Sequence, residues 1–307
     1  LVNGSTGSFG TGWFGAAGST TIGNGAILAT ANTASSGAGT LMLLGPITQG
    51  GTGLGSGTTA TNALVKAGQG TLFLGADNAT AGTFTGDLVV QGGTLMLGHA
   101  GALPGGVVTI GGTTLTAQAA ATTVVGSPVV TGITSTASMQ KGMSVAGSGI
   151  PAGAYIVSID SATQVTLSQN ATAGATIADL VASSSGRLDL NGFSTSKNFA
   201  ISGAGGQLAA NFSGAIWNSS TAPVTLSGNL TMGGNSSAGG SGDMTLSGNI
   251  TGAFGFTKTG ANTMLLSGSG NTYGAMTVSL GVLRLGHAAA LSDTASGTTV
   301  TSGAVLD

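Results

Sequence analysis

The chain has 307 residues, a formal net charge of −2 at pH 7, no cysteine and only 5% charged residues. These values exclude a disulfide framework and thiolate chemistry, and the lack of a basic cluster argues against a nucleic acid partner. No apolar run approaches the roughly 18 residues of a membrane-spanning helix, so direct membrane insertion is not expected.

The composition favours an all-β protein. Glycine accounts for 59 residues, glutamate is absent, and lysine and arginine together number only 6. Strong helix formers are therefore scarce, whereas Thr, Val and Leu suit strands joined by glycine-rich turns. A surface with so little charge also promotes association, which suggests an anchored or assembled protein.

The first part of the chain, residues 1–118, contains short segments in which apolar residues alternate with others. LFL at 72–74 and LML at 95–97 are examples, and a glycine follows each of them. Alternation places the two outer residues of a triplet on the same face of a strand. We therefore predict short strands separated by glycine-rich corners.

Residues 119–185 have a different pattern, with stronger alternation and no regular spacing of strands. SIDSATQVTLS at 158–168 predicts a β-hairpin that turns between Asp160 and Thr163. We predict that this stretch is a small β-domain inserted into a larger structure.

The last part, residues 186–307, has the clearest repeat. TLSGNL at 225–230, TLSGNI at 245–250 and LLSGSG at 265–270 follow one another at steps of 20 residues. A unit of this length is typical of one rung of a β-solenoid, because stacked rungs bury an apolar face that a single rung leaves exposed. We predict two β-solenoid modules, 1–118 and 186–307, with about 20 residues per rung.

A longer repeat relates the two modules. One copy starts at Lys66 and ends in LMLGHAGAL, and the other starts at Lys258 and ends in LRLGHAAAL. His99 and His287 therefore occupy matching positions. We predict that both are turn residues that bond to neighbouring backbone groups, and that they do not share a metal site.

These two stretches resemble the autotransporter-associated β-strand repeat, also called the passenger-associated transport repeat. The resemblance rests on the Lys-x-Gly that starts each copy, on LSGSGNTY at 266–273, and on GxLxLG at 93–98 and 281–286. The first copy departs from the pattern, because GADNATAGTF at 75–84 replaces the Asn-Thr-Tyr segment. The resemblance implies a right-handed parallel β-helix on or outside a bacterial surface, and it says little about activity.

A polysaccharide-active enzyme would need carboxylates held close together near a cation. The candidates are Asp160, Asp179 and Asp189, with Arg187 as the cation. The position of Asp189 recurs at Asp307, which favours a solvated residue on the outside of a rung. We therefore predict that the chain is not an enzyme and that it has no catalytic, cofactor-binding or metal-binding residue.

Two further features have a functional and a structural interpretation. GGSGDM at 239–244 is similar to a calcium-binding nonapeptide, but Asp243 falls one place early and no tandem copy follows. Trp13, Trp217, Tyr155 and Tyr273 could stack on sugars if they were exposed, although packing in the core or at corners is expected.

The main functional hypothesis is a non-enzymatic structural protein of a bacterial cell surface or an extracellular filament. Its rungs would continue in a longer chain or stack end to end on another copy, because an open end leaves strand edges unpaired. The alternative is an adhesin or glycan-binding passenger that contacts surface glycans through residues 119–185. A phage fibre is a related structural alternative.

Overall fold

The computed structural model describes residues 40–49, 64–80, 85–292 and 297–307, and also four short strands before residue 40. Within these ranges it leaves out residues 69, 113, 119–120, 141, 152–153, 178–179 and 206–213. All regular structure in these residues is β-strand, so the predicted all-β class is confirmed. The described residues contain no helix that could cross a membrane.

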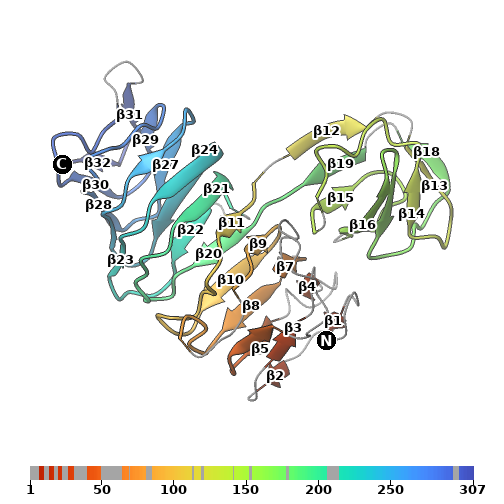
Figure 1. Cartoon of the computed structure of the whole chain (residues 1–307). Helices are drawn as coiled ribbons and strands as arrows, with labels where there is room; N and C mark the ends of the chain where they lie inside the picture. The colour runs from red at the N-terminus through yellow and green to blue at the C-terminus, as the bar shows by residue number, and fades with distance from the viewer. Residues whose placement is uncertain are drawn as a thin grey trace.

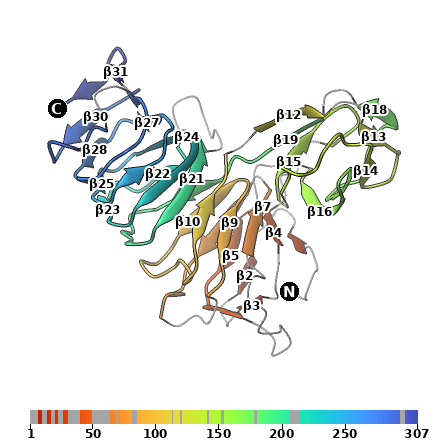
Figure 2. The same ribbon diagram turned by 45° about the horizontal axis from the view of Figure 1, so that its top comes forward.

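Most strands stack into three parallel ladders (Figures 1 and 2). The first ladder contains β1 (Gly7–Phe9), β4 (Ile27–Thr30), β7 (Leu64–Ala67), β9 (Leu88–Val90), β11 (Val108–Ile110), β21 (Phe199–Gly203), β24 (Leu230–Gly240) and β26 (Ile250–Thr251). The second contains β2 (Phe14–Ala16), β5 (Thr40–Leu43), β8 (Thr71–Leu74), β10 (Thr94–Leu97), β20 (Arg187–Asp189), β22 (Ile216–Asn218), β27 (Phe256–Thr259), β29 (Met276–Val278) and β31 (Thr298–Val300). The third contains β23 (Val224–Leu226), β25 (Met244–Leu246), β28 (Thr263–Leu266), β30 (Val282–Leu285) and β32 (Val305–Leu306).

The long strand β24 joins the first two ladders into one curled, 17-stranded parallel sheet. Its first half pairs with β21 and its second half pairs with β22. A further parallel pair, β3 (Thr20–Ile22) with β6 (Ile47–Gln49), lies beside this sheet. The three ladders together are compatible with the predicted β-solenoid.

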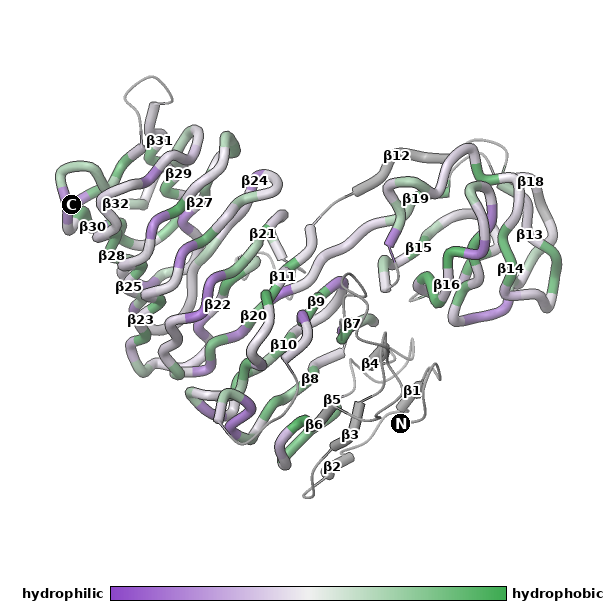
Figure 3. The backbone as a smooth tube through the Cα atoms, in the orientation of Figure 1, coloured by the Kyte–Doolittle hydropathy of each residue, from purple (hydrophilic) through white to green (hydrophobic). Residues whose placement is uncertain are grey.

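Alternate residues of the strands form one continuous core between the ladders. Strands β5, β8 and β28 alternate between half-buried and buried residues, as the triplet pattern predicts. Leu72, Leu95 and Leu188 are fully buried and lie in register on neighbouring strands. Each leucine lies against those of the neighbouring strands, so the apolar face is buried by stacking. Figure 3 shows hydrophobic residues recurring along the backbone of the stacked strands.

The third ladder reproduces the repeat seen in the sequence. Val224 pairs with Met244, and Met244 pairs with Met264, so strands twenty residues apart in the chain are neighbours. This register places the three TLSGN-like segments directly against one another.

The two copies of the longer repeat keep their strand order but lie on different ladders. Lys66 lies on β7 of the first ladder, whereas Lys258 lies on β27 of the second. The strands that follow, β8 and β28, are likewise on the second and third ladders. The similarity between the copies therefore describes local structure, and the second copy is advanced by one ladder around the stack.

Residues between β11 and β20 form a separate antiparallel unit, which we call the inserted domain (Figure 1). One of its sheets contains β12 (Thr114–Gln118), β19 (Leu180–Ser183) and β15 (Ser144–Ala146), and the other contains β16 (Ile156–Ser161), β17 (Gln164–Leu167), β14 (Val129–Thr131), β13 (Ala121–Thr123) and β18 (Ala175–Ile177). The predicted hairpin is present, since Ser161 pairs with Gln164 across a turn at 162–163. The antiparallel pairing already begins at Thr114, before residue 119.

The inserted domain has its own core and touches the parallel sheet through a small contact. Val130, Ile156 and Val165 belong to the domain's core. At the contact, Tyr155 packs with Val65 and Ala67 of β7 in a separate cluster. The Gln91 side-chain amide also donates a hydrogen bond to the Gln140 Oε1 atom at 2.5 Å.

Candidate functional site

Arg187 and Asp189 are the only two predicted catalytic candidates that lie together in the described residues. Both are on β20, and the Asp189 carboxylate accepts hydrogen bonds from the backbone of Asn191 and of Ser219, each at 3.0 Å. The Arg187 guanidinium lies 5.3 Å from the ring centroid of Trp217 and donates to the Gly214 carbonyl at 3.2 Å.

Burial lowers the pKa of Arg187, while the nearby Asp189 charge opposes that shift. Both side chains are more than nine-tenths buried. The Asp189 Oδ1 atom, which accepts from two backbone donors, connects β20 to the chain at Asn191 and Ser219.

Asp160 and Asp189 lie in different parts of the molecule. Asp160 is on β16 of the inserted domain, whereas Asp189 is on β20 of the parallel sheet (Figure 1). Slight burial raises the pKa of Asp160, but hydrogen bonds from Ser158, Thr166 and Gln164 lower it more, so the net pKa is below the ordinary value. Asp179 lies outside the described residues. Of the proposed catalytic set, only Arg187 and Asp189 are therefore brought together.

Both histidines make the turn contact that the sequence predicts. The His99 Nδ1 atom accepts a hydrogen bond from the Gly101 backbone at 3.0 Å, and His287 Nδ1 accepts one from Ala289 at 3.0 Å. Among the described residues, no group of three His, Cys, Asp or Glu side chains could hold a metal ion. The Asp243 carboxylate of GGSGDM accepts a hydrogen bond from the Thr263 backbone at 2.8 Å.

The tryptophan and the two tyrosines in the described part of the chain are packed inside, as predicted. Trp217, Tyr155 and Tyr273 are each less than a tenth exposed. Trp13 lies outside the described residues. None of the three described rings offers a flat exposed surface for sugar stacking.

Two lysines have a structural role that the sequence did not reveal. Lys66 and Lys258 are fully buried, although no carboxylate bonds to either of them. The Lys66 ammonium donates to the carbonyls of Ala67, Gly68 and Gly92 at 2.8–2.9 Å. The Lys-x-Gly pattern was the only signal in the sequence, and it marks the corner whose carbonyls the lysine binds.

Lys258 repeats this arrangement at the corner that follows β27. Its ammonium donates to the carbonyls of Thr259, Gly260 and Leu280 at 2.7–2.9 Å and to the Asn262 Oδ1 atom at 3.1 Å. Burial lowers the pKa of Lys66 to about 7 and that of Lys258 to about 8, with the Asp243 charge opposing the shift at Lys258. Each ammonium thus joins a corner of one strand to the chain that runs beside it.

Asn78 of the first copy makes the same kind of contact as Asn271 of the second copy, although the two segments differ in sequence. Its Oδ1 atom accepts a hydrogen bond from Ile47 at 2.6 Å, and its amide donates to the Ala102 carbonyl at 2.7 Å. Asn271 of the second copy accepts from Ile250 and donates to Ala290, both at 2.7 Å. GADNATAGTF therefore keeps the asparagine that bridges neighbouring layers, although the surrounding letters differ.

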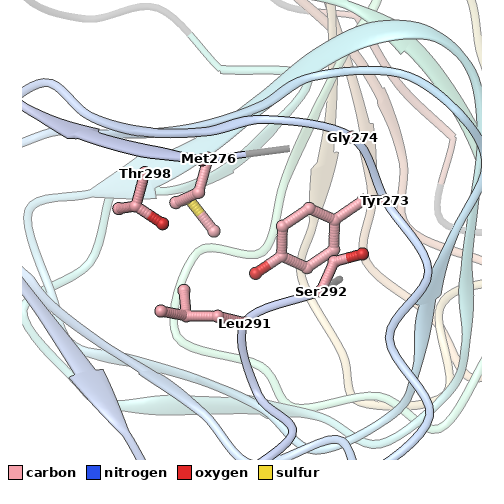
Figure 4. Close-up of a pocket in the computed structure, with 7 residues that line it drawn as sticks. Tyr273, Gly274, Met276, Leu291, Ser292 and Thr298 are labelled. Atoms are coloured by element: carbon pink, nitrogen blue, oxygen red, sulfur yellow. The ribbon is translucent and has the colours of Figure 1, made fainter. Parts of the chain in front are cut away.

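A hollow lies near the end of the ladders, at β29 and β31. Its volume is about 250 Å³, and it is lined by Tyr273, Gly274, Met276, Leu291, Ser292, Gly297 and Thr298 (Figure 4). The Tyr273 hydroxyl donates to the Ala290 carbonyl at 3.0 Å, and burial raises its pKa to about 12. The lining therefore contains no group that exchanges protons near neutral pH, and it is suited to apolar packing.

The strands beside this hollow expose large apolar side chains. Val300 and Leu306 are 42% and 38% exposed, although they are in register with the buried residues Val278 and Leu283. The same strand positions that are covered elsewhere in the stack are thus open at β31 and β32.

No protein-family model, curated protein or solved structure matches this chain.

Proposed function

We propose that this chain is a non-enzymatic structural component of a bacterial cell surface or an extracellular filament. It would act as a right-handed parallel β-helix whose rungs continue into a further rung at β31 and β32. The observation that carries this proposal is the exposure of Val300 and Leu306, which are in register with the buried residues Val278 and Leu283.

A further rung would cover three features at once. It would pair the edges of β31 and β32 that no described strand covers, bury Val300 and Leu306, and place side chains over the hollow beside Met276. Unpaired strand edges next to exposed apolar residues favour pairing with another strand. That rung would belong either to a continued chain or to a second copy.

The experiment is analytical ultracentrifugation of the 307-residue chain over a range of concentrations. We expect concentration-dependent association, because Val300 and Leu306 are exposed at strand positions that are buried elsewhere in the stack. The Val300→Lys/Leu306→Lys variant should remain monomeric, since burying two charges at the junction is unfavourable. Electron microscopy of the associated protein should show end-to-end rods.

The matched control is Val124→Lys/Val125→Lys in the inserted domain, where both valines are about two-thirds exposed. This variant should associate like the original chain. A chain that stays monomeric at every concentration would rule out the assembly proposal, as would an equal loss of association in the control.

A second proposal is an adhesin that uses the inserted domain. The domain stands off from the side of the parallel sheet (Figures 1 and 2), and it presents Val124, Val125 and Ile159 on its surface. Exposed apolar residues on a projecting domain favour contact with a partner. The two Lys variants separate the two proposals. Val300→Lys/Leu306→Lys should remove self-association and leave partner binding by the inserted domain intact, whereas Val124→Lys/Val125→Lys should weaken that binding and leave self-association intact.

A further inference from the structure

The outer face of the second ladder carries a regular array of hydroxyl groups. Thr257, Thr277 and Thr299 are in register on β27, β29 and β31. The core residues on either side of them in sequence, such as Phe256 and Met276, point inward, so these threonines point outward.

A second column runs beside the first. It consists of Thr259, Ser279 and Thr301, each two residues after a member of the first column. Backbone bonds from Ser279 to Lys258 and from Thr301 to Val278 continue the same register. We call the six residues of the two columns the hydroxyl array. Its hydroxyls repeat about every 4.8 Å along the stack, and its columns lie about 6.6 Å apart.

A shallow cavity of about 220 Å³ adjoins the array. It is lined by Ala204, Asn235, Ser236, Ser237, Thr257, Thr259 and Ser279. Ser237 is 4% exposed, and its Oγ atom has no hydrogen-bond partner among the described residues. A buried hydroxyl without a partner is costly, so a ligand that bonds to it would gain binding energy.

The chemistry of the lining limits the ligand. None of the residues of the array or the cavity is charged or aromatic, and Lys258 between Thr257 and Thr259 is fully buried. The absence of positive charge is unfavourable for phosphates and nucleic acids, and the absence of carboxylates is unfavourable for cations. The Thr259 hydroxyl already donates to the Ala238 carbonyl and the Thr301 hydroxyl to the Ser279 carbonyl, so these two offer a ligand an acceptor only. The array as a whole therefore offers both donors and acceptors, which matches a ligand rich in uncharged hydroxyls.

We propose that the hydroxyl array and the adjoining cavity bind a neutral polysaccharide. The chain of sugars would lie along the stacking direction, because the hydroxyls repeat in that direction at a constant interval. The Ser237 hydroxyl and the Asn235 amide would bond to one sugar unit in the cavity. This site lies on the side of the parallel sheet, so it is independent of assembly through the end at β31 and β32.

The test is affinity electrophoresis of the whole chain in native gels that contain soluble mannan, dextran or hydroxyethyl cellulose. We expect at least one of these neutral polymers to slow migration, whereas the charged polymer polygalacturonate should not. Thr257→Val/Thr277→Val keeps the branched shape and removes two hydroxyls, so the dissociation constant should rise about tenfold or more.

The matched control is Thr225→Val/Thr245→Val. These threonines are also in register, but on β23 and β25 of the third ladder. The control should bind like the original chain, to within about twofold. If the Thr257→Val/Thr277→Val variant fails to fold, Ser237→Ala should still fold, because it removes an unpaired buried hydroxyl, and it should weaken binding about fivefold.

Three results would overturn the proposal. In the first, no neutral polysaccharide slows the chain. In the second, the array variant and the control variant bind equally. In the third, Ser158→Ala/Thr166→Val on the inserted domain abolishes binding, which would assign glycan contact to that domain.

Discussion

Lys66 and Lys258 are the residues whose environments differ most from those expected of their type. Lysine usually keeps its ammonium in water, yet both of these are fully buried. Corners between strands leave carbonyls without partners, and an ammonium offers three donors in a compact group. The corner therefore supplies carbonyl acceptors for the buried ammonium. The ammonium in turn bonds to carbonyls that an apolar side chain would leave without a partner.

The titration of these lysines predicts how stability depends on pH. Their folded pKa values are about 7 and about 8, below the ordinary value of 10.5. Between about pH 8 and about pH 9.5 the unfolded chain therefore binds more protons than the folded chain, and the free energy of unfolding rises with pH. We expect urea unfolding to show a rise of at least about 1 kcal/mol over this interval.

The interval ends below pH 10 because the buried Tyr273 has a raised pKa of about 12. Above its ordinary value of 10.0, the unfolded tyrosine would lose its proton first, and stability would fall again. A Lys66→Met/Lys258→Met variant should lack the rise. A free energy of unfolding that falls between pH 8 and 9.5 in the unchanged chain would contradict this assignment.

At the scale of elements, glycines allow the corners of successive strands to approach one another. Gly228, Gly248 and Gly268 follow the three strands β23, β25 and β28. A Cβ atom on Gly248 would lie 2.1 Å from the Gly228 carbonyl oxygen, and one on Gly268 would lie 2.5 Å from the Gly248 oxygen. The glycine of the Ser-Gly repeat therefore has a steric cause, because a side chain there would push neighbouring layers apart.

Gly248→Ala should accordingly destabilise the third ladder. We expect the free energy of unfolding to fall by about 2 kcal/mol, since the contacted atom is backbone and cannot move away easily. Urea unfolding of the variant checks this value. The matched control is Gly233→Ala, where no atom lies within 4 Å of the added methyl group.

The control should change stability by less than about 1 kcal/mol in either direction. Equal effects of the two substitutions would show that backbone freedom, and not the distance between layers, decides the cost. A neutral Gly248→Ala would mean that the layers can separate at this corner.

At the scale of the whole molecule, the parallel sheet and the inserted domain are two bodies with separate cores. The apolar contact between them consists of Tyr155 and Val157 against Val65, Ala67 and Val89. Such a small contact contributes a few kcal/mol at most, mainly from burial of the tyrosine ring. The orientation of the inserted domain therefore depends strongly on one side chain.

Tyr155→Ala should release the inserted domain from β7. Small-angle X-ray scattering should report a larger radius of gyration, while thermal unfolding of the parallel sheet should be nearly unchanged. Tyr155→Phe keeps the ring and serves as the control, so its scattering should match that of the original chain. Unchanged scattering in Tyr155→Ala would show that the two chain connections hold the domain by themselves.

The sequence by itself determined the local structure of this protein. Alternating triplets such as LFL at 72–74 predicted strands, and the step of 20 residues predicted which strands of the third ladder would be neighbours. The turn contacts of the histidines were also predictable, because both histidines occupy the same position in two copies of one repeated segment. These features depend on residues that are adjacent in the chain or on a constant repeat length, and both can be read from the amino-acid sequence.

Only the tertiary structure decided what these local units do together. It placed the two copies of the repeat on different ladders, because the strands and connections between them add up to a shift of one ladder. It buried Lys66 beside Gly92 and aligned Thr257 with Thr277 on one outer face. Such contacts join residues from different layers, and their partners follow from how the chain winds and not from any single segment.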